Sequence, residues 1–195
     1  FAQTMEVRRE EEPQMTYVLN KITECDDGKP RMREISKIEK VVVHKVGDSL
    51  GETGPEISRS FKDTSKYAAG SYTGGQMPYT FIIRKDGTID QCLPMTDTGP
   101  HAKKWNSSSV SVACIGDFTK HAPTNEQECA LIDLLTALAG YGLTIHGHTE
   151  LPGSSSDPKK QCPGPHLDLN AMRNEVKYKL ETKRLEALLD VGIKI

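Results

Sequence analysis

Short apolar runs rich in β-branched residues alternate with helical patterns along this chain, and this alternation constrains the fold more than any other feature. Residues 38–46 (IEKVVVHKV) and 109–118 (SVSVACIGDF) have the composition of buried strands. Residues 79–93 (YTFIIRKDGTIDQCL) predict a β-hairpin with Asp86-Gly87 at its turn. A shorter strand is expected over 143–148 (LTIHGH). The fold class that follows is α/β, a mixed central β-sheet flanked by helices.

Three helical patterns separate or follow these strands. Residues 54–70 carry apolar side chains at roughly helical spacing and end at a glycine. Thr124 and Gln127 form the pattern of a capping box that opens a second helix, which Gly140 or Gly142 ends. The apolar face of that helix is formed by Ala130, Leu131, Leu134, Leu135 and Leu138. A third helix is expected over 168–190, with one apolar side made by Leu169, Met172, Val176, Leu180, Leu185 and Leu188.

The predicted elements divide the chain into a core domain and two extensions. Residues 1–36 are charged and weakly patterned, with at most one short strand around 15–22 (MTYVLNKI). The core domain is expected over 37–170, which is long enough to bury a real core. Residues 171–195 form an amphipathic extension that packs on the core, self-associates or docks on a partner; packing is the interpretation we favour.

Composition excludes several classes of protein. The net charge of −2 lacks the basic excess that nucleic-acid binding requires. No apolar run approaches the roughly 20 residues of a membrane span, so no membrane insertion is expected. The odd number of scattered cysteines is a poor disulfide framework and favours reducing surroundings. They are Cys25, Cys92, Cys114, Cys129 and Cys162, of which Cys114 is expected to be buried within its strand.

Three residues in or just after strand-like segments have the chemistry of metal ligands. His44, His148 and Cys162 offer two imidazoles and a thiolate, which suit a zinc site whose fourth position stays open. Their spacing matches no compact metal-binding motif. The alternative is that the histidines are polar residues at strand ends and that the cysteine lies on the surface.

The surrounding segments resemble a known family. VVVHKV, PYTFIIRKDGTI, GPHAKKWNSSSVSVACIGDF, IHGHTELPG and KKQCPGPHLDL occur in the order found in zinc-dependent N-acetylmuramoyl-L-alanine amidases. That family includes bacteriophage amidase endolysins and peptidoglycan recognition proteins, and the resemblance covers residues 38 to 170. It implies that His44, His148 and Cys162 hold one zinc ion. His146 is the alternative to His148, which is favoured because it precedes the Thr-Glu step.

The resemblance also implies two catalytic residues. Tyr79 matches the family tyrosine near the zinc-bound water, and Lys160 matches the lysine that phage amidases place beside the scissile carbonyl. A cationic or hydroxyl group there would stabilise the oxyanion that forms during amide hydrolysis. The alternatives are a Tyr79 ring that only packs in the core, and Lys159 in place of Lys160.

The segment HAKKWN supplies candidate substrate contacts. His101 and Asn106 match family positions that line the cleft beside the metal, where they would hold muramyl-peptide. Trp105 would stack on sugar or peptide, with a purely structural role as the alternative. His101 as a fourth metal ligand is disfavoured, because catalytic zinc sites keep one position open.

The resemblance therefore implies an enzyme that cuts the amide bond between N-acetylmuramic acid and L-alanine in bacterial peptidoglycan. A phage endolysin or virion-associated lysin is the expected setting, made in the host cytoplasm without a visible signal peptide and acting on the cell wall. The alternatives are a non-catalytic peptidoglycan-binding module and a bacterial wall-recycling amidase.

Overall fold

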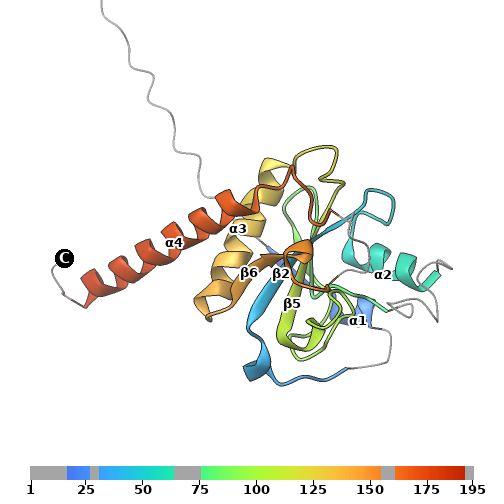
Figure 1. Ribbon diagram of the computed structural model, residues 1–195, viewed down its shortest axis with the longest axis horizontal. Coiled ribbons are helices and arrows are strands. Elements are labelled where there is room, and N and C mark those ends of the chain that lie inside the picture. Colours follow the sequence, from blue (N-terminus) through green and yellow to red (C-terminus); the bar gives the residue numbers. More distant parts are fainter. Residues whose placement is uncertain (1–16, 27–30, 64–75, 155–160, 192–195) are drawn as a thin grey trace, which may run out of the picture.

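A computed structural model describes residues 17–26, 31–63, 76–154 and 161–191 of the chain (Figure 1). Among these residues, strands form one mixed sheet in the order β1-β4-β3-β5-β2-β6. Its strands are β1 (Val18–Asn20), β2 (Lys40–Val46), β3 (Phe81–Ile83), β4 (Ile89–Gln91), β5 (Ser109–Ile115) and β6 (Thr144–Gly147). The β3–β4 pair is antiparallel and the other pairs are parallel. The predicted fold class is confirmed.

Helices cover both faces of this sheet. The longer helices α3 (Asn125–Gly140) and α4 (Leu169–Asp190) lie together on one side, and α2 (Gly54–Asp63) lies on the other (Figure 1). A short helix, α1 (Ile22–Cys25), packs near α2, and three single turns of 3₁₀-helix complete the fold. These turns are η1 (Ile35–Lys37), η2 (Asn106–Ser108) and η3 (His148–Glu150).

Alternation along β2 divides the interior into two compartments. Val41 and Val43 belong to the hydrophobic cluster under α3 and α4, whereas Val46 belongs to the cluster under α2. Successive strand side chains point to opposite faces, so His44 shares the α2 face with Val46. Its partner strand β5 is buried at every position, which confirms the predicted buried strand and the burial of Cys114. Burial raises the pKa of the Cys114 thiol to about 12, so it stays protonated.

The local signals in the sequence are largely confirmed. Strands form within 38–46, 109–118 and 143–148, and the 79–93 segment folds into the β3–β4 hairpin. Thr124 and Gln127 form the expected capping box at the start of α3. The helix expected over 54–70 begins at Gly54 and is described to Asp63, and the remainder of that prediction lies outside the described residues.

The N-terminal segment contributes to the domain. β1, which confirms the short strand expected around 15–22, pairs in parallel with β4. Arg33 is buried, donates from Nε to the carbonyl of Met95 (2.9 Å), and donates from Nη1 to the carbonyls of Asn106 (2.9 Å) and Ser109. Burial lowers the pKa of Arg33 to about 10, which leaves it charged at pH 7. Residues within the predicted 1–36 extension therefore support the loop that leads into β5.

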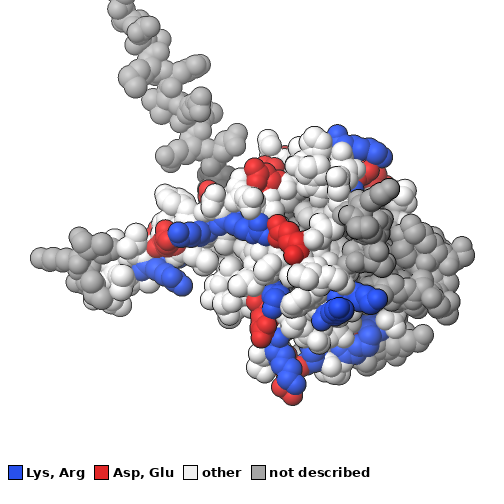
Figure 2. All heavy atoms as spheres, in the orientation of Figure 1, with Lys and Arg blue, Asp and Glu red and all other residues white. Residues whose placement is uncertain are grey.

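Helix α4 is amphipathic over only part of its length. Leu169, Met172 and Val176 are buried in the core cluster, as the sequence predicts. Leu185 and Leu188, expected on the same apolar side, are 46% and 40% exposed, because the helix extends beyond the body of the domain (Figure 1). Basic and acidic side chains both lie along α4 on the face in Figure 2. The helix also carries the Lys177–Glu181 ion pair at 3.8 Å. None of the helices in the described ranges combines the length and apolarity that crossing a bilayer requires.

Candidate metal centre

His44, His148 and Cys162 meet in the interior at one end of the sheet. Their potential ligand atoms all lie within 4.8 Å of one another, and the side chains are 2%, 3% and 4% exposed. Sγ of Cys162 is 3.7 Å from Nδ1 of His44, and the two imidazole centroids are 4.5 Å apart. The alternative of an incidental surface cysteine is therefore wrong.

Strand pairing explains how residues so distant in sequence come together. β2 and β6 are parallel neighbours, with Val43 opposite Gly147. His44 and His148 are the next residues after this pair, so they lie at the same height along the sheet. The carbonyl of Cys162 accepts hydrogen bonds from the backbone N–H (3.1 Å) and the hydroxyl (3.0 Å) of Thr149. These two bonds tie the loop that carries the thiol to the turn that carries His148.

Hydrogen bonds to the protein determine which nitrogen of His148 carries the proton. Nε2 of His148 lies 3.1 Å from the carbonyl oxygen of Ser154. Because a carbonyl oxygen only accepts, Nε2 donates and Nδ1 holds the lone pair. The Ser154 hydroxyl donates back to the carbonyl of His148, which fixes the turn. Two imidazoles with fixed neighbours and a thiol form the N₂S donor set that structural and catalytic zinc sites use.

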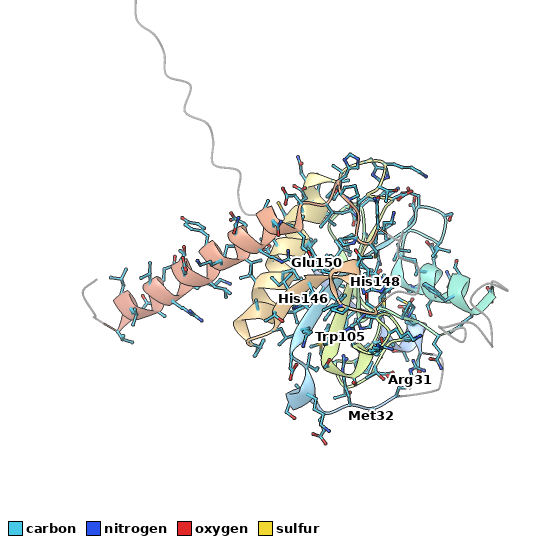
Figure 3. All side chains as sticks on the ribbon, in the orientation of Figure 1. Arg31, Met32, Trp105, His146, His148 and Glu150 are labelled. Carbon is cyan, nitrogen blue, oxygen red and sulfur yellow. The ribbon has the colours of Figure 1, made fainter. Side chains whose placement is uncertain are left out.

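His146 lies outside this cluster. It is only partly buried on β6, and its Nε2 is 2.9 Å from the Thr144 hydroxyl. Figure 3 shows His146, His148 and Glu150 close together where β6 leads into η3, with Trp105 on the neighbouring loop. Of the two candidate histidines, the structure brings His148 to the cluster.

Tyr79 lies beside the cluster, just before β3. Its ring centroid is 5.3 Å from that of His44 and 6.0 Å from that of Phe61, and the side chain is partly buried. The ring therefore packs on the core and against a candidate ligand at the same time. Lys159 and Lys160 lie outside the described residues, and their role stays a prediction.

The three residues expected to contact substrate have different surroundings. His101 is 6% exposed, and its Nδ1 is 3.0 Å from Nε2 of His44. Burial, reinforced by the electrostatic effects of His148 and Arg33, lowers the pKa of His101 to about 3, so its ring is neutral at pH 7. The Asn106 side-chain oxygen accepts from the backbone N–H groups of His101 (3.1 Å) and Ala102 (2.7 Å).

Trp105 is half-buried, and its indole N–H forms a hydrogen bond. Its Nε1 donates to the carbonyl of Pro152 at 3.1 Å, and Nζ of Lys40 lies 5.1 Å from the ring centroid. Direct contacts of His101, Asn106 and Trp105 with substrate stay predictions.

Three further residues near the cluster, Ser109, Ser154 and Arg33, carry no signal in the sequence. The Ser109 hydroxyl lies 3.3 Å from Nε2 of His101, and the Ser154 carbonyl lies 3.1 Å from Nε2 of His148. Arg33 donates a hydrogen bond to the carbonyl of Ser109. Serine is common in loops and at strand ends, so no local pattern distinguishes these positions.

A cavity of about 480 Å³ lies beside the loop that carries Cys162. It is lined by that loop, by η3 and by the first turn of α4. Cys162 therefore belongs both to the lining of this cavity and to the cluster with the two histidines.

The mixed sheet and its helices define the fold of amidases and peptidoglycan recognition proteins. The endolysin amidase LysCS from Clostridium intestinale superposes with a TM-score of 0.65 at 20% identity, covering 85% of this chain and 99% of that one. The Ph2119 endolysin from a Thermus scotoductus bacteriophage superposes with a TM-score of 0.63 at 20% identity, covering 82% and 98%.

Sequence comparison assigns the family. The profile of the family described as N-acetylmuramoyl-L-alanine amidase matches residues 34–165, more than half of the chain. The chain belongs to this family. Peptidoglycan-recognition protein SC2 of Drosophila simulans is 25% identical over 126 residues, 65% of this chain and 68% of the relative. Peptidoglycan-recognition protein 1 of Holotrichia diomphalia is 26% identical over 130 residues, 67% and 66% respectively.

Proposed function

We propose that this protein is a zinc-dependent N-acetylmuramoyl-L-alanine amidase that hydrolyses the amide bond between N-acetylmuramic acid and L-alanine in bacterial peptidoglycan. The observation that carries the proposal is the buried cluster of His44, His148 and Cys162, whose ligand atoms lie within 4.8 Å of one another. Family membership supports an amidase or a peptidoglycan-binding protein, and the intact donor set favours the enzyme.

His44, His148 and Cys162 would hold the zinc ion. When bound, zinc polarises a carbonyl and lowers the pKa of a coordinated water towards ~7. Burial of all three side chains supports this assignment, since a dry site strengthens electrostatic interactions with a substrate. The Ser154 carbonyl orients the His148 ring, so that its Nδ1 lone pair is available as a ligand.

Tyr79 and Lys160 are proposed to stabilise the oxyanion. The Tyr79 ring centroid lies 5.3 Å from that of His44, and this closeness to a candidate ligand supports the proposed role. Losing one donor of this kind costs on the order of a hundredfold or more in turnover. Asn106 and Trp105 are proposed to border the muramyl-peptide, Asn106 mainly by holding the backbone of the 101–106 loop.

The test is to compare Cys162→Ala with Cys129→Ala. Cys129 is an exposed thiol on α3, so its loss controls for the removal of a cysteine. We expect Cys162→Ala to lose zinc and the release of stem peptides from purified sacculi together, while Cys129→Ala keeps both. Mass spectrometry of the digest should show stem peptides with a free L-alanine amino terminus.

Two results would overturn this proposal. If the Cys162→Ala variant released stem peptides at the normal rate, the cluster would not be the catalytic site. If the unmodified protein bound sacculi and zinc but released no peptides, it would be a binding module instead.

For the biological setting, we propose a phage lysis enzyme or virion-associated lysin that is made in the host cytoplasm. The Lys160-x-Cys162 arrangement supports this setting, and a wall-recycling bacterial amidase is the alternative. Cells that produce the protein should lyse only after the inner membrane is permeabilised. Lysis without permeabilisation would contradict a cytoplasmic enzyme that waits for membrane breach.

A further inference from the structure

A chain of hydrogen bonds leads from His44 away from the metal centre. Nε2 of His44 is 3.0 Å from Nδ1 of His101, and Nε2 of His101 is 3.3 Å from the hydroxyl of Ser109. That hydroxyl donates to the carbonyl of Trp105 at 2.6 Å. His44, His101 and Ser109 are all buried, so protein groups rather than bulk water determine their hydrogen bonding.

The Trp105 carbonyl at the end of this series of hydrogen bonds determines which group donates in each bond. A carbonyl oxygen only accepts, so the single hydroxyl proton of Ser109 is directed to Trp105. The Ser109 oxygen then accepts from Nε2–H of His101, which leaves the lone pair of the neutral His101 ring on Nδ1. That lone pair accepts the Nε2–H of His44. Nδ1 of His44 therefore holds the lone pair, and it is the nitrogen that lies 3.7 Å from the Cys162 thiol.

The loop that carries His101 is itself held in place. The side-chain oxygen of Asn106 accepts from the backbone N–H of His101, and the guanidinium of Arg33 donates to the carbonyls of Asn106 and Ser109. The backbone N–H of Lys103 donates to the carbonyl of Ser154 at 3.2 Å, the same carbonyl that accepts from His148. This loop thus supplies the acceptor for His44, which is His101, and holds the Ser154 carbonyl that accepts from His148.

We propose that His101 is a positioning residue: through Ser109 and the Trp105 carbonyl it holds His44 in the tautomer and orientation that present Nδ1 to the metal. The proposal rests on the metal-binding part of the proposed function. In this role His101 acts through His44, whose Nε2 lies 3.0 Å from its Nδ1. Outer hydrogen-bond partners of metal ligands typically contribute 10- to 100-fold in metal affinity.

The variants His101→Leu and His101→Asn separate this role from simple packing. Leucine fills the space without an acceptor, whereas asparagine places a side-chain oxygen close to the position of Nδ1. We expect zinc affinity, measured by competition with a chelator, to fall about 10- to 100-fold in His101→Leu and to recover largely in His101→Asn. The visible absorption spectrum of the Co²⁺-substituted protein should change in His101→Leu and return towards the unmodified spectrum in His101→Asn.

Two further variants complete the test. His146→Leu removes a partly buried histidine of β6 that is not in the cluster, and it should leave affinity and spectrum unchanged. Ser109→Ala keeps the His101 ring but removes the acceptor of its Nε2–H, and it should weaken zinc binding severalfold. This variant provides the measurement if His101→Leu does not fold.

The outcomes distinguish this proposal from the proposed function. Unchanged zinc affinity and an unchanged Co²⁺ spectrum in folded His101→Leu, or in Ser109→Ala if the leucine variant does not fold, would overturn the positioning role. An unmodified protein that binds zinc, shows the His101 effects and releases no stem peptides would overturn the amidase proposal alone. An unmodified protein without affinity for zinc or Co²⁺ would overturn both.

Discussion

Arg173 in α4 forms an ion pair with Glu150 in η3, two positions after the candidate ligand His148. Glu150 also accepts the backbone N–H of Gly147 at 2.8 Å, and Arg173 donates to the carbonyl of Ile145. The first part of α4 therefore holds the turn that presents His148. The C-terminal helix contributes to the metal centre without supplying a ligand.

Removing different lengths of α4 should separate its two parts. Deletion of residues 183–195 removes exposed side chains such as Leu189 and should change the melting temperature little. Deletion of 171–195 removes Met172 and Val176, each worth about 1.5–3 kcal/mol of burial, as well as Arg173. We expect the protein that lacks residues 171–195 to be strongly destabilised and to bind zinc poorly. Equal thermal melts for the two truncations would contradict this division of the helix.

Replacing Arg33 should destabilise the loop beneath the site. Arg33→Ala removes the donor to the buried carbonyl of Ser109 and to the partly buried carbonyls of Met95 and Asn106, and an unsatisfied buried acceptor costs about 1–3 kcal/mol. We expect a loss of about 3 kcal/mol or more in the free energy of unfolding, measured by urea denaturation. Arg59→Ala, at an exposed position of α2, is the control and should change stability by about 0.5 kcal/mol or less. Equal effects of the two changes would show that the hydrogen bonds of Arg33 do not stabilise this loop.

Two glycines with positive φ provide a matched pair. Gly87, in the β3–β4 turn, has φ +81°, and a Cβ there would lie 2.8 Å from the carbonyl oxygen of Glu126. Gly142, after α3, has φ +89° and open space around a Cβ. Gly142→Ala should cost about 1–2 kcal/mol from the backbone conformation alone. Gly87→Ala should cost clearly more, because the hairpin turn must also move away from α3. Calorimetric melts that rank the two in the opposite order would contradict this reasoning.

The sequence predicted elements that depend on local chemistry, and it missed contacts that depend on tertiary structure. The Thr124–Gln127 capping box and the β-branched run of β2 are local signals, and both are present. The partners Arg33 and Ser109 are 76 residues apart, and only the folded sheet brings them together. Cys162 was a candidate ligand from its chemistry, but its loop has no apolar pattern that indicates burial, so only the family resemblance favoured it over a surface cysteine.

The outer part of α4 shows a second limit on what can be predicted from the sequence, namely which apolar positions of a helix are buried. A helix of 22 residues is about 33 Å long, and the apolar spacing of Leu185 and Leu188 continues the pattern of the buried turns. Periodicity indicates which side of a helix is apolar, but it does not indicate how far the body beneath it extends. That length depends on α3, which ends at Gly140.

Metal binding should stabilise the folded chain in a way that identifies the donor set. A ligand present at about 100 times its dissociation constant adds about 2.7 kcal/mol of stability, which corresponds to about 5–10 °C in the melting temperature of a chain of this size. Metal-free protein titrated with Zn²⁺ should show such a rise. Mg²⁺ at the same concentration should not, because it prefers oxygen ligands to the imidazoles and thiolate of His44, His148 and Cys162.

The His148→Ala variant tests whether this stabilisation arises at the cluster. Removing one of the three ligands should abolish most of the Zn²⁺-dependent rise, whereas His146→Ala, which changes a histidine two residues earlier, should keep it. Scanning calorimetry of each variant with and without Zn²⁺ measures the difference directly, independently of turnover. A full rise in His148→Ala would place the stabilising zinc ion elsewhere, since Cys162 and His44 together provide only two protein ligands, fewer than the three of a catalytic zinc site.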